Sequence, residues 1–458
     1  MKKVFIQGLG FVGSAMAVAV ASKLNDQGDP MFDVTGIDLP SAEGKKRIDY
    51  LNKGIFPFKT NDKDLKNYTK KAIKNGNLRA THDNKAFSEA SIILVSINCD
   101  LIKANGSVKI ELDSFKNSIK SLARCVSENT LVIIESTVPP GTCDKIVYPI
   151  FKKIFNKRKL NINKLYLAHS YERVMPGKNY YDSVKNYWRV YAGYNNESAI
   201  KCRDFLNEII NTKDFPLTRL SNTIASETGK VLENSYRAVN IAFMEEWGRF
   251  AEDAGFDLYE VINAIRMRPT HSNIRQPGFG VGGYCLTKDP LFAKIATKDI
   301  LNLKSHDFPF STMAIKVNSK MPLVSLSKLK KYFDGNLKNR KILLMGVTYR
   351  QDVGDTRFSP SETFVKEAIK EGADISAFDP MVMFWEEMQM ELISSFPEAN
   401  DYDAVVFAVP HKEFSAISLS KWITKKSILL LDANNVLTEK QNKELIDNKL
   451  NYLSIGRG

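Results

Sequence analysis

A single cysteine in a glycine-rich segment is the residue of this chain best suited to covalent chemistry. Cys285 lies in the run Gly278-Phe-Gly-Val-Gly-Gly-Tyr-Cys-Leu-Thr-Lys-Asp-Pro290, in which four glycines precede the thiol. Glycine is used where the backbone needs unusual angles or approaches a ligand closely, so this thiol is placed for reaction rather than packing. A buried structural thiol is the alternative interpretation, and the glycines disfavour it.

Several polar groups could assist such a thiol, which at neutral pH needs a nearby cation or base to become nucleophilic. Lys288 and Asp289 follow Cys285 closely, and Lys230 and Asn234 are spaced i, i+4 so that they share one helix face. A lysine and an amide aimed at one oxygen would stabilise an oxyanion as it forms. A solvated surface lysine is the ordinary alternative; the polar neighbours Glu233, Asn234, Arg237 and Asn240 argue against it.

The chain opens with the fingerprint of a dinucleotide site. Gly8 permits a tight turn after a short apolar strand, Gly10 lets the backbone approach a pyrophosphate, and Gly13 permits close packing of helix on strand. The N–H groups at the start of the following helix would bind the phosphates. The predicted cofactor contacts in this part of the chain are Gly8, Gly10, Phe11, Val12, Gly13 and Asp38.

The acid that ends the second predicted strand indicates which cofactor is used. Asp38 should accept hydrogen bonds from the ribose hydroxyls of NAD and repel the 2′-phosphate of NADP. Lys45, Lys46 and Arg47 bring positive charge that acts against this preference. A simple turn acid is the alternative role for Asp38. We predict NAD as the cofactor and expect no bound metal.

Two further loops carry polar residues beyond predicted strands. Ser136 and Thr137 follow the fourth strand, where ligands of an open α/β sheet bind, although helix capping is the alternative role of such hydroxyls. Glu172 and Arg173 stand in the loop Tyr171-Glu-Arg-Val-Met-Pro-Gly177, and elsewhere they would form an ordinary surface ion pair.

The elements that must position these residues are indicated by short apolar runs bounded by helical patterns, which are typical of a buried parallel sheet. We predict a helix over Ser14–Leu24 after the glycine turn. The pattern recurs near the C-terminus, with a helix over Ser361–Lys370 but without the three-glycine turn, so the second copy should bind something other than the dinucleotide. The predicted strands are Lys2–Gly8, Phe32–Asp38, Ser91–Ile97, Thr130–Glu135, Lys341–Met345, Ala373–Phe378, Ala404–Val409 and Ser427–Leu431.

The fold class is therefore α/β, with two Rossmann-like doubly wound domains joined by a long central helix and a small helical domain. The helix is predicted over Ser221–Gly255 and a shorter one over Tyr259–Ile265. We divide the chain into an NAD-binding domain (1–212), a central helical domain with the cysteine loop (213–318) and a second Rossmann-like domain (319–458). The apolar positions of the central helices form either a dimer face or an interdomain spine.

Composition limits the function classes that remain. The net charge of +13 could attract nucleic acid, but the lysines are spread along the chain and no RNA-binding or zinc-finger signature is present. A basic surface that attracts anionic small molecules explains the charge better. Five cysteines without close pairing fit a reducing compartment. We find no membrane-spanning run and no signal peptide, and we expect a cytoplasmic protein that binds neither nucleic acid nor membrane.

Several segments together resemble the nucleotide-sugar 6-dehydrogenases, the UDP-glucose/GDP-mannose dehydrogenase family, over nearly the whole chain. The pattern Glu-Arg-Val-x-Pro-Gly is similar to the branch that acts on UDP-N-acetylhexosamines more than to the UDP-glucose branch. Tyr171 stands where that branch often has proline, and Thr287 and Lys288 replace more usual residues. The segments that carry the resemblance are Glu135–Gly141, Glu172–Gly177, Lys230–Asn240, Gly278–Pro290 and Gly346–Pro360.

The resemblance implies an NAD-dependent, four-electron oxidation of a primary alcohol to a carboxylate, for surface polysaccharide precursor synthesis. Cys285 would form a thiohemiacetal with the intermediate aldehyde and then a thioester that water hydrolyses. Lys230 and Asn234 would stabilise oxyanions, Asp289 and Thr137 would organise water, and Glu172 would be a general base or acid. Ser136, Thr137 and Arg357 would contact NAD.

The resemblance also implies the substrate contacts and a homodimer or higher homo-oligomer formed through the central helix. UDP-glucose remains an alternative sugar. A two-electron 3-hydroxyacid-type dehydrogenase is the alternative enzyme, and a ligand sensor without chemistry is the alternative class. The implied substrate contacts are Glu172, Arg173, Val174, Lys230, Asn234, Arg237, Arg268, Phe279, Gly280, Gly282, Gly283, Tyr349 and Arg350.

Overall fold

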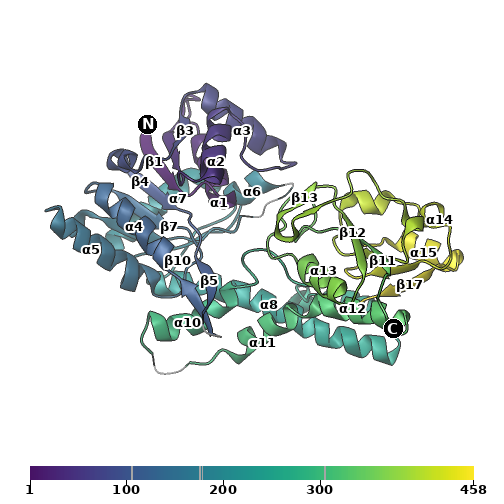
Figure 1. Ribbon diagram of the computed structural model, residues 1–458. Coiled ribbons are helices and arrows are strands. Elements are labelled where there is room, and N and C mark those ends of the chain that lie inside the picture. Colours follow the sequence, from purple (N-terminus) through teal and green to yellow (C-terminus); the bar gives the residue numbers. More distant parts are fainter. Residues whose placement is uncertain (105–106, 175–176, 178, 304–305) are drawn as a thin grey trace. The chain divides into compact units, whose positions relative to one another are not determined.

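The computed structural model describes residues 1–104, 107–174, 177, 179–303 and 306–458 (Figure 1). Within these ranges the chain forms a large sheet near the N-terminus, a smaller one near the C-terminus, and a helical segment between them in sequence. Among the described helices, none combines the length and the hydrophobicity that a membrane crossing requires.

The N-terminal sheet has eight strands in the order β10-β9-β8-β7-β4-β1-β2-β3. Every neighbouring pair is parallel except β8 and β9, which run antiparallel. The carboxyl ends of six parallel strands therefore meet at one edge, where the predicted cofactor residues follow β1, β2 and β7. The strands are β1 (Lys2–Gln7), β2 (Phe32–Ile37), β3 (Leu78–Thr81), β4 (Ile92–Val95), β7 (Leu131–Ile134), β8 (Tyr166–His169), β9 (Val190–Gly193) and β10 (Thr218–Arg219).

Helices cover both faces of this sheet, which is why its central strands are apolar on both sides. One core contains side chains of α1, α2, α3, α6 and α7, and another contains side chains of α4 and α5. An additional hairpin joins β5 (Asp100–Ala104) to β6 (Ser107–Glu111). The helices are α1 (Phe11–Ala21), α2 (Ala42–Asn52), α3 (Lys63–Lys74), α4 (Asp113–Cys125), α5 (Tyr148–Lys157), α6 (Tyr180–Lys185), α7 (Asn196–Ile209) and α10 (Phe292–Asp299).

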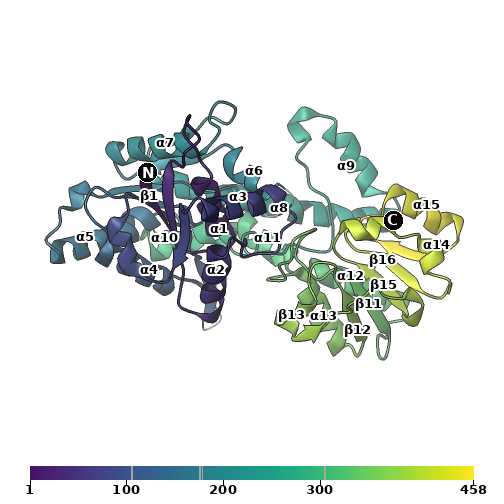
Figure 2. The ribbon, with the colours of Figure 1, turned by 90° about the horizontal axis from the view of Figure 1, so that it is seen from above.

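The C-terminal sheet is parallel throughout, in the order β12-β11-β15-β16-β17. Figure 2 shows α12 and α13 on one side of these strands and α14 and α15 on the other, in agreement with the two cores of this region. A small antiparallel pair joins β13 (Phe384–Trp385) to β14 (Met390–Glu391). The sheet strands are β11 (Lys341–Met345), β12 (Asp374–Phe378), β15 (Ala404–Phe407), β16 (Leu429–Asp432) and β17 (Asn451–Ser454).

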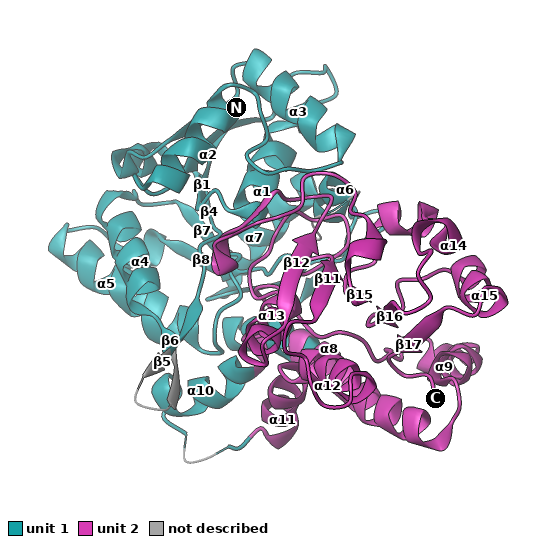
Figure 3. Cartoon of the chain, turned by 45° about the vertical axis from the view of Figure 1, so that its right-hand side comes forward, with its two compact units in different colours: residues 1–233, 291–307 teal, residues 234–290, 308–458 magenta. Residues whose placement is uncertain are grey.

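The central segment is dominated by α8 (Thr223–Ala254), a helix of 32 residues. Gly255, with φ +80°, ends the helix in the left-handed conformation that glycine tolerates. The chain divides into two compact units, one of residues 1–233 and 291–307 and one of residues 234–290 and 308–458 (Figure 3). We call them unit 1 and unit 2. The remaining helices of unit 2 are α9 (Leu258–Arg266), α11 (Pro309–Asn318), α12 (Met321–Tyr332), α13 (Pro360–Lys370), α14 (Leu419–Trp422) and α15 (Glu439–Asp447).

The predicted α/β class, with two Rossmann-like sheets and a long central helix, is confirmed. Both boundaries of the first helix were wrong, because it spans Phe11–Ala21 rather than Ser14–Leu24. The other predicted elements differ from the observed ones by at most two residues at either end. The residues Phe11, Val12 and Gly13, interpreted as loop, belong to the first helical turn. Beyond the predicted strands, the sequence-based prediction missed β3, β8, β9, β10, β17 and the antiparallel pairs β5–β6 and β13–β14.

Candidate active site

The glycine turn of unit 1 has the geometry that a dinucleotide pyrophosphate requires. Gly8 has φ +93°, and a Cβ there would lie 2.7 Å from the backbone oxygen of Ser96. A Cβ on Gly13 would lie 1.8 Å from the backbone oxygen of Gly8, so only glycine lets α1 pack this closely. Gly10 caps α1 with its backbone, and no described atom lies within 4 Å of its missing Cβ. The helix therefore presents its first N–H groups to an open face, which suits a phosphate.

The first turn of α1 is fixed from one side by aromatic residues. Phe11 stacks on Phe58 with ring centroids 4.0 Å apart, and Tyr180 donates a hydrogen bond of 2.5 Å to the carbonyl oxygen of Phe11. Phe11 and Val12 also pack against the core. These contacts hold the start of the helix in place before any ligand binds.

Asp38 follows β2, as predicted, and the structure supplies it with a cation. Oδ1 of Asp38 accepts the N–H of Leu39 at 2.8 Å, and Nε of Arg47 lies 3.1 Å from Oδ2. Arg47 is one of the basic residues after the acid and comes from α2, which Ser41 caps. The carboxylate therefore keeps its place at the strand end while part of its charge is balanced.

The segment after β7 is anchored by two buried glutamates. Ser136 donates a hydrogen bond of 2.5 Å to the carbonyl of Ile97, and Thr137 is half-buried beside it. Glu135 lies 3.3 Å from Nη1 of Arg189, and burial raises the pKa of Glu135 to about 7. Glu227 of α8 accepts the N–H groups of Gly141 and Cys143 at 2.6 and 2.7 Å. No sequence signal identified Glu227, because its partners lie over eighty positions away.

The loop after β8 is fastened to the first part of α8. Lys230 donates a hydrogen bond of 2.8 Å to the carbonyl oxygen of Glu172, and the hydroxyl of Tyr171 donates to Glu233 at 3.0 Å. Arg173 forms an ion pair with Glu233 and donates to the carbonyl of Trp188 at 2.7 Å. The Glu172 carboxylate accepts the N–H of Val174. Met175 and Pro176 of the predicted motif lie outside the described residues.

In unit 2 the predicted thiol is exposed and a buried acid lies behind it. The carbonyl oxygen of Cys285 accepts the N–H groups of Lys288 and Asp289 at 3.2 and 2.9 Å. The Asp289 carboxylate is fully buried, 2.9 Å from Nζ of Lys288, and it accepts a hydrogen bond of 2.7 Å from Asn234. Lys288 also lies 4.2 Å from the centroid of the Tyr284 ring. Cys285, Asp289 and Asn234 are thus brought together, with Lys288 balancing the buried charge.

The glycines before the thiol are required because the segment after β11 passes closely over them. Cβ atoms on Gly280 and Gly282 would each lie 2.7 Å from Pro360, and one on Gly283 would lie 2.7 Å from the Tyr349 ring. Burial raises the pKa of Tyr349 to about 12, so its phenol stays protonated. The glycine backbone of the cysteine loop therefore packs directly against Tyr349 and Pro360 of unit 2.

A cavity of about 240 Å³ lies beside this contact. Its wall includes exposed Arg350 and half-buried Tyr349, together with Phe279 and Gly280. All four are predicted substrate contacts. Arg357 is held by Asp355, whose carboxylate raises its pKa. Arg237 and Arg268 are both exposed, on α8 and just after α9. The cavity is lined by Phe279, Gly280, Thr348, Tyr349, Arg350, Gln351, Pro360, Ser361, Ala408, Val409, Pro410 and Asn434.

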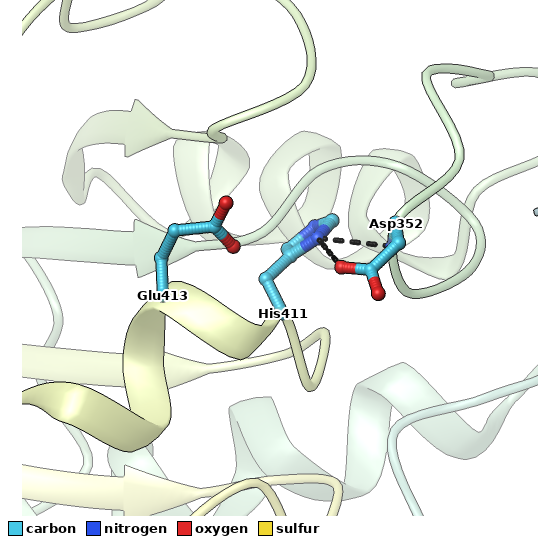
Figure 4. A group of neighbouring side chains, drawn as sticks. All are labelled: Asp352, His411 and Glu413. Atoms are coloured by element: carbon cyan, nitrogen blue, oxygen red, sulfur yellow. Dashed lines mark hydrogen bonds and ion pairs between the residues drawn. The ribbon is translucent and has the colours of Figure 1, made fainter. Parts of the chain in front are cut away.

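A polar cluster supports the same loop. Asp352, His411 and Glu413 offer ligand atoms within 4.8 Å of one another (Figure 4). His411 is already engaged, because its Nδ1 accepts the N–H of Asp352 at 3.3 Å and its Nε2 lies 3.1 Å from Asp379. Lys412 lies 3.7 Å from the Asp352 carboxylate. We interpret these contacts as structural: they attach the loop that carries Arg350 and Asp352 to the segment after β15, which carries His411.

Known proteins resemble this chain over nearly its whole length. A UDP-N-acetyl-D-mannosamine dehydrogenase of Methanocaldococcus jannaschii is 30% identical over 449 residues, covering 98% of this chain and 92% of the relative. The UDP-D-ManNAc dehydrogenase structure from Pyrococcus horikoshii has the same fold, with a TM-score of 0.83, 24% identity and coverage of 100% and 99%. An NDP-N-acetyl-D-galactosaminuronic acid dehydrogenase structure from Methanosarcina mazei Go1 also has this fold, with a TM-score of 0.81 and 24% identity. The match covers 100% of this chain and 95% of that structure.

The family match extends over most of the chain. Residues 2–211 match the NAD binding domain of the UDP-glucose/GDP-mannose dehydrogenase family, residues 224–320 its central domain, and residues 343–439 its UDP binding domain. The glycine turn falls in the first segment, the exposed thiol in the second and Arg350 in the third. The chain therefore belongs to the UDP-glucose/GDP-mannose dehydrogenase family and is an NAD-dependent nucleotide-sugar dehydrogenase.

Proposed function

We propose that this enzyme oxidises the C6 primary alcohol of a UDP-N-acetylhexosamine to the carboxylate in a four-electron reaction. The observation that carries the proposal is the exposed Cys285 thiol, in a glycine loop whose next turn contains the fully buried Asp289. A dehydrogenase that stops at the aldehyde needs no such thiol, whereas oxidation to the acid needs a group that holds the half-oxidised sugar.

The chain's own residues then have distinct tasks. The turn of Gly8, Gly10 and Gly13, with Ser136, Thr137 and Arg357 as further contacts, would hold two NAD molecules in succession, and each would accept one hydride. The Cys285 thiolate adds to the aldehyde carbon and forms a thiohemiacetal, which retains the C–H bond that is lost in the second oxidation. The resulting thioester is hydrolysed by water, which releases the acid and regenerates the thiol.

The polar groups stabilise charge and move protons in these steps. Lys230 and Asn234 donate hydrogen bonds to the alkoxide and the later oxyanions. Asp289, whose charge is balanced by Lys288 at 2.9 Å, and Thr137 orient the hydrolytic water. Glu172 accepts or returns the proton of the substrate hydroxyl.

The UDP moiety is assigned to the cavity of unit 2, where Arg350 supplies positive charge for the diphosphate and Tyr349 a protonated phenol. For the sugar we propose the N-acetylmannosamine series, because the Methanocaldococcus jannaschii relative with that name matches over 98% of this chain. The product would supply surface polysaccharide synthesis. The further proposed sugar contacts are Arg173, Val174, Arg237, Arg268, Phe279, Gly280, Gly282 and Gly283.

We further propose that the protein is a homodimer or higher homo-oligomer built on the central domain, taken as residues 213–318 between domains 1–212 and 319–458. The second half of α8 exposes Tyr236, Phe243, Trp247 and Phe250, each about half exposed. Aromatic side chains recurring at such spacing on one helix are typical of an interface between subunits.

NADH yield at limiting sugar tests the function. The purified protein is incubated with excess NAD and, separately, with UDP-ManNAc, UDP-GlcNAc, UDP-GalNAc, UDP-glucose and GDP-mannose. We expect two NADH per UDP-ManNAc and a lower kcat/KM for the others. One NADH per sugar would indicate a two-electron dehydrogenase, and binding without NADH formation would indicate a sensor. A preference for UDP-glucose would refute the proposed sugar.

A further inference from the structure

The buried residue Tyr171 lies beside Lys230, the lysine that stabilises the oxyanions in the proposed function. Tyr171 is 2% exposed, in the loop that follows β8. The centroid of its ring is 5.6 Å from Nζ of Lys230 and 5.3 Å from the guanidinium carbon of Arg173. Both distances lie within the range of cation–π attraction. The ring therefore contributes to the environment of both cations.

The phenol of Tyr171 fits a gap in α8 that a glycine provides. A Cβ on Gly229 would lie 3.3 Å from the Tyr171 hydroxyl oxygen, 3.5 Å from Cε1 and 3.8 Å from Cζ. Glycine inside a helix destabilises it relative to alanine, so a glycine here needs a reason. The contact with the hydroxyl oxygen is tighter than ordinary packing, and the contacts with the ring carbons are not. Gly229 thus makes room for the hydroxyl in particular.

Hydrogen bonds attach the loop to the helix on both sides of this contact. The Tyr171 hydroxyl donates to Glu233 at 3.0 Å, and Lys230 donates to the carbonyl oxygen of Glu172 at 2.8 Å. Burial raises the pKa of Tyr171 to about 12, so its hydroxyl keeps the proton that it donates. Because Tyr171 and Glu172 are consecutive, the position of the phenol sets the position of the carbonyl that orients the Lys230 ammonium.

We propose that Tyr171 is a positioning residue for Lys230 and that Gly229 is its matched partner. The hydroxyl, seated over Gly229 and bonded to Glu233, fixes the Glu172 carbonyl and so the direction of the ammonium group. This inference rests on the proposed function, in which Lys230 stabilises the oxyanions. Tyr171 itself contacts no reacting atom in this account.

A double-mutant cycle tests the proposal. Tyr171→Phe removes the hydroxyl together with its hydrogen bonds to Glu233 and Arg173, and it should lower kcat about tenfold with the KM for NAD unchanged. Gly229→Ala should lower kcat several-fold, because the hydroxyl must move by a few tenths of an ångström. In the Tyr171→Phe background the same alanine meets only ring carbons at ordinary distance, so it should cost no further activity. Thermal unfolding of each variant is measured in parallel.

Tyr181→Phe is the matched control, since it also removes a largely buried hydroxyl of unit 1, one that is hydrogen-bonded to Ser22 at 2.7 Å. Its kcat should equal that of the wild type. An unimpaired Tyr171→Phe variant, or losses that add in the double variant, would overturn the inference. The inference would also be overturned if the kcat of the variants fell only in proportion to their loss of melting temperature. A wild type that forms no NADH, or a fully active Lys230→Ala variant, would instead overturn the proposed role of Lys230.

Discussion

The two sheets of this chain begin in the same way and then build their ligand sites differently. In each, the first strand is followed by a glycine with left-handed φ, +93° at Gly8 and +103° at Gly346. A Cβ would lie 2.7 Å from the backbone of Ser96 in one case and 2.5 Å from Val409 in the other. Each glycine thus lets the chain turn beneath the segment that follows a neighbouring strand. The shared turn is a property of the fold, not of the ligand.

The difference begins directly after the turn. In unit 1 the helix starts at Phe11, and no side chain caps its first N–H groups, because the capping residue is Gly10. In unit 2 the helix starts at Pro360, and the Ser359 side chain accepts the N–H of Ser361 at 3.2 Å. A long loop that carries Arg350 separates this helix from β11. Under the proposed function, unit 1 therefore offers a helix terminus to the diphosphate of its ligand, and unit 2 offers side chains.

The acids after the second strands differ in the same sense. The Asp38 carboxylate forms an ion pair with Arg47. Asp379 is instead 1% exposed, and its carboxylate accepts the N–H groups of Val347 and Thr348 at 2.8 and 3.0 Å. Burial would raise the pKa of Asp379, but hydrogen bonding to His411 and to backbone N–H groups lowers it below its usual 3.8. Asp379 thus holds a loop, whereas Asp38 has the ligand role that the proposed function gives it.

The largest effects should come from the two turn glycines. Gly8→Ala and Gly346→Ala each force a side chain into left-handed backbone, at about 1–2 kcal/mol, in addition to the steric overlap. We expect Gly8→Ala to lose NAD binding and keep UDP binding, and Gly346→Ala to do the reverse. Calorimetric titration of both variants with NAD and with UDP measures this. Loss of both ligands in both variants would mean that the two sites do not depend on separate turns.

The next effect separates the two acids. Asp379→Asn should lower the free energy of unfolding by roughly 3 kcal/mol, because a buried acceptor of several N–H groups loses its charge. Asp38→Asn should change stability by less than ~1 kcal/mol, since its Arg47 partner is about a quarter exposed and, among the described residues, Asp38 accepts the N–H of Leu39 alone, while it weakens NAD binding. Urea unfolding and NAD titration of both variants make the comparison. Equal stability losses would contradict the assignment of different roles.

The pH dependence of the Asp379 effect has a definite sign. Because the folded-state pKa lies below 3.8, the ionised carboxylate stabilises the folded protein at pH values above 3.8. That contribution is lost progressively as the pH falls below 3.8 and through the folded-state value. The stability difference between wild type and Asp379→Asn should therefore be constant near neutrality and shrink in acid. A difference that grows as the pH falls would show that the sign is wrong.

The smallest effects concern the helix starts. Ser359→Ala should cost about 1 kcal/mol, because α13 loses its capping hydroxyl, and should leave NAD binding unchanged. Gly10→Ala should leave the melting temperature nearly unchanged, since its Cβ meets no described atom within 4 Å, yet weaken NAD binding by filling the open face. Thermal unfolding with and without NAD distinguishes them. A stable Gly10→Ala variant with full NAD affinity would contradict the proposal that the backbone at Gly10 lies against the NAD pyrophosphate.

Sequence alone predicted the features whose signals are local. Apolar runs such as Ile92–Val95 and Leu131–Ile134 identify buried parallel strands, and the glycine spacing identifies the turn before the first helix. The strand of Leu78–Thr81 was missed because its alternating polar residues carry no apolar run. The strand of Tyr166–His169 was also missed, although it is no shorter than Ile92–Val95. The first helix was placed three residues late because Phe11 and Val12 were interpreted as part of the turn.

Pairings across the chain could not be predicted in this way. Only the fold brings together the segments that form the ion pair of Asp38 with Arg47, the hydrogen bond of Asp379 with His411 and the fit of Tyr171 to Gly229. Tyr171 was recognisable as an unusual residue for its position, but its partner in α8 was not. Likewise, the sequence placed Asp289 near the thiol without indicating that Asn234 donates to it.

The central claim is that the Cys285 sulfur carries the sugar between two oxidations. The most direct measurement is intact-protein mass spectrometry of Cys285→Ser and wild type, quenched during reaction with NAD and UDP-ManNAc, together with assay of the uronic acid. We predict that the wild type forms the acid through a transient adduct on the Cys285 peptide, and that the serine variant binds NAD but forms no acid. Full turnover to the uronic acid by Cys285→Ser would contradict the account.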